Sequence, residues 1–103
     1  MLKDVKKTSE MENDFRKNPM LMIDYAYEAI TENIILTEAM KEIFDRNTHL
    51  IEKIPVGEVL KKMNMFLELD IFSTNFKIIE GLKIWRVVQH YSDEAVRQTR
   101  IIQ

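Results

Sequence analysis

The sequence of 103 residues contains no cysteine and only two glycines and two prolines. Without cysteine, the chain can form no disulfide framework, no thiolate zinc site and no cysteine nucleophile. The shortage of glycine and proline argues against turn-rich sandwiches and barrels, whose many turns favour these residues. Because apolar residues make up 46% and charged residues 31% of the chain, the composition predicts one globular, mainly helical domain.

Long uncharged runs are also missing from the sequence. Runs such as residues 20–23 and 33–37 fall far short of the roughly 18–20 apolar residues that cross a bilayer. Charged residues near the N-terminus are followed by no apolar stretch before Met20, unlike a secretory signal. We therefore expect a cytoplasmic protein without membrane contact, with a flexible segment over residues 1–8 and a single helical domain over residues 9–103.

Charge is distributed unevenly along the chain. Residues 18–52 hold two basic and seven acidic side chains, whereas residues 53–103 hold eight basic and six acidic ones. A nucleic-acid-binding domain normally carries a much stronger basic patch than this. The pattern predicts weak affinity for nucleic acid and, for the acidic middle region, a basic partner.

Two signals predict helix starts in the first part of the chain. Ser9 and Glu12 have the spacing of a capping box, which predicts a helix over residues 9–17. Asn18 before Pro19 is a strong pair for an N-cap and a first helical position, so a second helix should begin near Pro19.

The clearest pattern is an apolar stripe at three- and four-residue steps between residues 19 and 54. It predicts one long amphipathic helix, with residues 45–48 as the place for any break because turn-prone residues cluster there. Asn33 and Asn47 lie on the stripe, where a buried amide would need a partner. We expect Asn47 at the edge of the stripe with its amide in water. For Asn33, both a buried position and a position in water stay open. The stripe consists of Met22, Ala26, Ala29, Leu36, Met40, Ile43, Leu50 and Ile54.

Beyond Pro55, a helix is predicted from Val56 to Asp70 or Phe72. It is apolar on two sides, which indicates either a central position or a partner that covers one side. Residues 76–91 fit either a buried helix or a hairpin that turns at Glu80 and Gly81, and the helix is favoured by its helical flanks. Ser92 is expected to cap a last helical stretch.

These elements predict an all-α fold, a small antiparallel bundle of four to five helices. The alternative is an α+β fold with a hairpin at about residues 76–91.

No residue pattern predicts a reaction. Neither His49 nor His90 follows a glutamate by three residues, as ligands of a di-metal bundle do, and the carboxylates lie opposite the apolar stripe. The three serines Ser9, Ser73 and Ser92 occupy expected caps or turns. We therefore predict a non-enzyme with no catalytic residues, no metal ligands and no cofactor.

The best hypothesis is a non-enzymatic protein–protein interaction module, such as an adaptor, an inhibitor or a regulatory subunit, that self-associates as a homodimer. Its large apolar side chains would supply binding energy and its acidic row would attract a basic partner. One alternative is a nucleic-acid-binding transcriptional regulator that uses the basic C-terminal part, and another is a small carboxylate-metal enzyme. The predicted partner-binding residues are Met63, Phe66, Trp85, Glu28, Glu32, Glu38 and Glu42.

Overall fold

The computed structural model describes residues 8–70 and 75–102, and in this part of the chain every regular element is helical. The elements are α1 (Thr8–Lys17), α2 (Met20–Thr31), α3 (Glu38–Asn47), the 3-10 helix η1 (Thr48–Lys53), α4 (Val56–Leu67), the 3-10 helix η2 (Phe76–Ile78) and α5 (Lys83–Ile102). The predicted all-α bundle is confirmed. Apart from Thr8, the segment predicted to be flexible lies outside the described residues.

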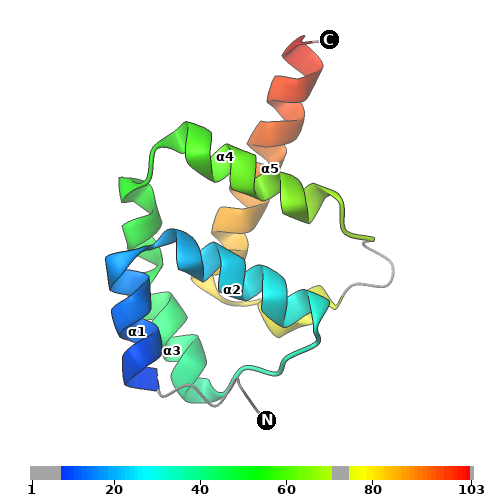
Figure 1. Ribbon diagram of the computed structural model, residues 1–103. Helices are drawn as coiled ribbons and strands as arrows, with labels where there is room; N and C mark the ends of the chain where they lie inside the picture. The colour runs from blue at the N-terminus through cyan, green and yellow to red at the C-terminus, as the bar shows by residue number, and fades with distance from the viewer. Residues whose placement is uncertain (1–7, 71–74, 103) are drawn as a thin grey trace.

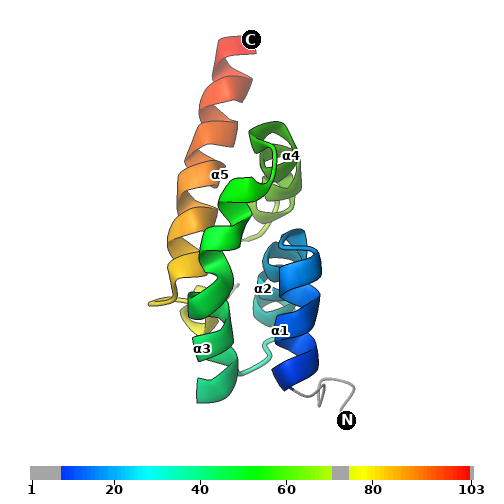
Figure 2. The same cartoon turned by 90° about the vertical axis from the view of Figure 1, so that its left-hand side faces the viewer.

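Helix α5 runs along the length of the molecule and serves as a packing partner for α2, α3 and α4 (Figure 1). Helix α1 lies beside α3 and also contacts α2. Figure 2 shows that the C-terminal end of α5 extends past α4. Within the described part of the chain, no helix is both long and apolar enough to cross a membrane.

The apolar stripe forms the core, as its spacing predicts. Met22, Ala26 and Ile43 are among its buried members. The rings of Phe15, Tyr25 and Phe44 join α1, α2 and α3 through aromatic contacts, with ring centroids 5.0 to 6.0 Å apart. Aromatic pairs in such tilted and edge-to-face geometries add stability beyond the burial of their area.

The prediction of one long helix over residues 19–54 is wrong, because the chain breaks at Asn33. This residue has φ 58°, a left-handed conformation that asparagine tolerates better than most side chains. The amide of Ile34 then donates to the carbonyl of Ala29 at 2.8 Å, which closes α2 with a Schellman motif. Thr37 begins α3 by accepting a hydrogen bond from the amide of Met40 at 3.2 Å. Asn33 is exposed, so its role on the stripe is to end a helix.

At the predicted break over residues 45–48, the chain stays helical and changes from α3 to η1. Asn47 lies there at 2% exposure, which corrects the expectation that it sits at the solvent edge. Its side-chain amide donates at 2.8 Å both to the carbonyl of Ile43 and to the Glu12 carboxylate. The buried amide is therefore satisfied by two acceptors, one on its own helix and one on α1.

Glu12 does not act as the second half of a capping box, because its carboxylate is directed at α3. Arg46 donates to both of its oxygens, at 2.9 and 3.1 Å. Hydrogen bonds from Arg46, and then from Asn47, lower the pKa of Glu12 from its ordinary 4.5 to about 2. Ser9 lies inside α1, which begins at Thr8, whereas Asn18 does cap α2 by accepting from the amide of Met20.

The favoured single helix over residues 76–91 is wrong, and the alternative hairpin is not formed either, because the 3-10 helix η2 is followed by a turn and α5 begins only at Lys83. Glu80 and Gly81 form a turn between η2 and α5, and Gly81 has φ 94°, a value that glycine adopts without strain. Ser92 lies inside the continuous α5, so the separate last helix is wrong. Helix α4 ends at Leu67, before the predicted Asp70, and the other predicted end at Phe72 lies outside the described residues. Helix α4 contacts both α2 and α5, and one of its apolar sides is buried there. On its other apolar side Met65 and Leu69 stay partly exposed, so a central position does not account for both sides.

Replacing Glu12 with glutamine should produce a pH-dependent loss of stability. The lowered pKa means that the ionised carboxylate favours the folded state above its ordinary pKa and that this contribution is lost as the pH falls towards 2. Urea unfolding should therefore show the largest gap between wild type and Glu12→Gln above about pH 5, shrinking as the solution is acidified. Glu10→Gln is the matched control for removing an acidic charge from α1. A gap that stays constant over this pH range would contradict the assignment.

Substitutions at Asn33 should separate backbone conformation from side-chain contacts. Asn33→Ala and Asn33→Gly both remove the long contact to the amide of Asn75, at 3.4 Å, but only glycine accepts the left-handed conformation freely. We expect alanine to cost about 1 kcal/mol more than glycine in the free energy of unfolding. Equal stabilities in urea unfolding would show that the turn does not depend on this conformation.

Candidate functional site

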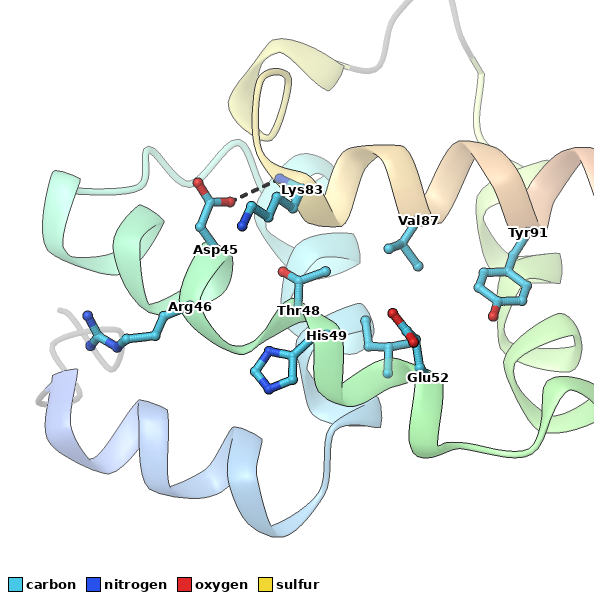
Figure 3. Close-up of a pocket in the computed structure, with 9 residues that line it drawn as sticks. Asp45, Arg46, Thr48, His49, Glu52, Lys83, Val87 and Tyr91 are labelled. Atoms are coloured by element: carbon cyan, nitrogen blue, oxygen red, sulfur yellow. Dashed lines mark hydrogen bonds between the residues drawn. The ribbon is translucent and has the colours of Figure 1, made fainter.

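The first candidate site is a polar pocket of about 330 Å³ between α3, η1 and the first half of α5 (Figure 3). Ile51 and Val87 supply its apolar surface, and charged residues of both signs surround them. The pocket is lined by Asp45, Arg46, Thr48, His49, Ile51, Glu52, Lys83, Val87 and Tyr91.

Several polar groups of this pocket are occupied by structural hydrogen bonds. Asp45 accepts from the backbone amide of Lys83 at 2.9 Å, so a carboxylate on α3 caps the first turn of α5. The Thr48 hydroxyl donates to the carbonyl of Phe44 in the same chain segment, and Arg46 is paired with Glu12. These contacts fix the junction of α3, η1 and α5.

The remaining groups do not form a catalytic arrangement. Figure 3 shows the ring of His49 directed away from Glu52 and Tyr91, which enter the pocket from opposite sides. Thr48 directs its hydroxyl to a backbone carbonyl, whereas a nucleophile would need a hydrogen bond to its base. Among the described residues, no three histidine, aspartate or glutamate side chains come close enough to hold a metal ion together.

The second candidate site is an apolar pocket of about 280 Å³ where the end of α4 meets η2 and α5. Phe66 and Val88 are buried at its base, and Leu67 on its wall is 42% exposed. The rings of Phe76 and Trp85 lie with their centroids 5.2 Å apart. We call it the Trp85 pocket. It is lined by Phe66, Leu67, Leu69, Phe76, Trp85, Val88, Gln89, Ser92 and Asp93.

The structure brings two of the predicted partner-binding residues together in the Trp85 pocket. Phe66 reaches it from α4 and Trp85 from α5, although 18 residues of sequence lie between them. The third apolar residue, Met63, is fully buried, and its sulfur accepts a long contact from the Ser92 hydroxyl at 3.9 Å. Met63 thus belongs to the core of the chain.

The four predicted glutamates do not share one helix. The break at Asn33 leaves Glu28 on α2 and Glu32 just after it, whereas Glu38 and Glu42 lie on α3. All four are exposed, and Glu38 is paired with Lys41 at 3.5 Å. None of them lines the polar pocket or the Trp85 pocket, and their predicted role in steering a partner stays a prediction.

Leu67, Phe76 and Asp93 were missed as site residues by reasoning from the sequence. The second apolar side of α4 indicated that part of this helix would remain exposed, but the sequence did not show which side that would be. Asp93 resembled a cap residue after Ser92 because the continuity of α5 was not recognised. The turn at Gly81, which brings Phe76 against Trp85, depends on tertiary packing.

Replacing Asp45 tests whether its carboxylate is structural. Asp45→Ala removes the acceptor for the Lys83 amide and should cost about 1 kcal/mol in the free energy of unfolding, the usual effect of losing a helix cap. Asp45→Asn keeps an acceptor oxygen and should cost less. Thermal unfolding at neutral pH measures both, and equal stabilities of wild type and Asp45→Ala would show that the contact does not support α5.

Comparisons of this chain with protein-family models, with curated proteins and with solved structures find no match.

Proposed function

We propose that this domain is a non-enzymatic protein–protein interaction module that binds one large apolar side chain of a partner in the Trp85 pocket. The observation that supports this proposal is the meeting of Phe66, Phe76 and Trp85 in a pocket that is open at the surface. Tryptophan and other aromatic residues are enriched in the binding hot spots of protein interfaces, where anchors from one protein fill pockets on the other.

The size of the pocket suits a single side chain. Small-molecule sites usually measure about 300–1,000 Å³, and the Trp85 pocket, at about 280 Å³, falls just below this range. Its lining is mainly apolar, with Gln89, Ser92 and Asp93 as the polar residues. A single aromatic or branched aliphatic side chain matches both the volume and the chemistry.

The two alternative functions have less support. For nucleic-acid binding, Lys83, Arg86 and His90 are exposed on α5, but Arg97 is engaged by Glu94 at 2.8 Å. The formal net charge of −2 also disfavours binding to nucleic acid, because contacts between basic side chains and phosphates supply most of the affinity of such complexes. For a carboxylate-metal enzyme, Asp45 is occupied as a helix cap.

The partner can be a second copy of the chain or a different protein. Self-association as a homodimer, a regulatory or adaptor role and a cytoplasmic location stay predictions from the sequence. The Trp85 pocket would serve as the binding surface in each of these roles.

A photo-crosslinking side chain at position 89 tests the proposal in the full chain. Gln89 is exposed and lines the pocket, so a crosslinker there should join the chain to a defined protein in cells that express it. The intact mass of the adduct distinguishes a second copy from another protein. Leu67→Gln, which places an amide on the pocket wall, should reduce the adduct at least about fivefold, because it removes apolar surface that a partner would bury, worth roughly 1 kcal/mol.

Val56→Gln is the matched control. Val56 is 55% exposed at the other end of α4, outside the pocket, so its replacement changes a similar amount of exposed apolar surface on the same helix. It should leave the adduct unchanged. The proposal is wrong if no protein adduct forms at position 89, or if the two variants reduce the adduct equally.

A further inference from the structure

The Trp85 pocket has one charged side chain in its lining, the carboxylate of Asp93. Asp93 is exposed, and among the described side chains it forms no ion pair. The neighbouring acid, Glu94, is engaged by Arg97 at 2.8 Å, so this arginine is already held by another carboxylate. The apolar pocket therefore carries an uncompensated negative charge at its edge.

The other charged residues near the pocket do not cancel the negative charge of Asp93. Glu68 is exposed between the two lining residues Leu67 and Leu69, which adds a second carboxylate near the wall formed by the end of α4. Lys77 and Arg86 follow Phe76 and Trp85 in sequence and are exposed, but neither lines the pocket. A group seated in the pocket thus meets a carboxylate before it meets either cation.

We infer that the partner's apolar anchor stands beside a cationic group, so that a basic segment of a protein is selected over an acidic one. This inference rests on the proposed function and specifies the chemistry of its partner. Asp93 accepts the ammonium or guanidinium group while the apolar anchor enters among the aromatic rings. Trp85 adds to the selection, because the indole ring is the best cation–π partner among the aromatic side chains.

A matched pair of small probes tests whether the Trp85 pocket prefers a positively or a negatively charged ligand. We would use 2-phenylethylamine, which is an ammonium ion at neutral pH, and 3-phenylpropanoate, which carries a carboxylate on a similar chain. Trp85 is the only tryptophan in the sequence, so its fluorescence and its indole N–H resonance report on this pocket alone. At low salt the ammonium probe should bind about fivefold more tightly, since one exposed carboxylate weakly attracts the ammonium group and weakly repels the carboxylate.

Two variants and one change of solution assign the preference to Asp93. Asp93→Asn should remove most of the preference for the ammonium probe. Glu94→Gln should leave this preference unchanged, because Glu94 is held by Arg97. Raising the salt concentration to about 0.5 M should also reduce it, since screening weakens exposed charges. Circular dichroism should show unchanged helix content, because Asp93 is exposed.

The outcomes separate this inference from the proposed function. Equal binding of the two probes, tighter binding of the carboxylate probe, or an unchanged preference in Asp93→Asn would overturn the selection of a basic partner while leaving the pocket as a docking site. Failure of both probes to change the Trp85 signals, at concentrations that saturate weak fragment binding, would overturn the pocket itself and with it the proposed function.

Discussion

The apolar face of α5 is the constraint on which the rest of the fold depends. Ile84, Val88 and Ala95 are buried along it, and α2, α3 and α4 all pack against this one helix. At about 100° per residue, Val87 and Tyr91 fall on one side of this stripe and Trp85 and Ser92 on the other. The first pair lines the polar pocket beside α3 and η1, and the second lines the pocket beside α4. Both candidate sites therefore arise where neighbouring helices meet α5.

Polar residues that could suggest chemistry are largely used to hold the helices in place. Glu12 joins α1 to α3 through Arg46 and Asn47, and Asp45 joins α3 to the start of α5. These are contacts between elements distant in sequence, and each satisfies groups that would be costly to leave unpaired at a helix junction. By contrast, Phe76 and Trp85 are partly buried against the core, and we propose that a partner covers the rest of their surface.

The fold class and the core were predictable from the sequence because helical periodicity is a local property. Met22, Ala26 and Ile43 are buried as their spacing predicts, and Asn18 caps α2 as expected. The break at Asn33 was not predictable, because only the tertiary fold decides whether such an asparagine continues a helix or ends it. The same limit applies to the candidate site. Phe66 and Trp85 could be singled out by size, but the sequence does not show that η2 and the turn at Gly81 bring Phe76 beside them.

Locating an uncharged probe tests most directly whether the Trp85 pocket accepts one large apolar side chain, as we propose. Nuclear Overhauser effects between 2-phenylethanol and the full chain would show where an aromatic anchor binds without any contribution from charge. We predict contacts from the phenyl protons to Trp85, Leu67 and Phe76, which line the pocket. Contacts to Tyr91 in the polar pocket, or contacts scattered over the surface, would contradict the claim.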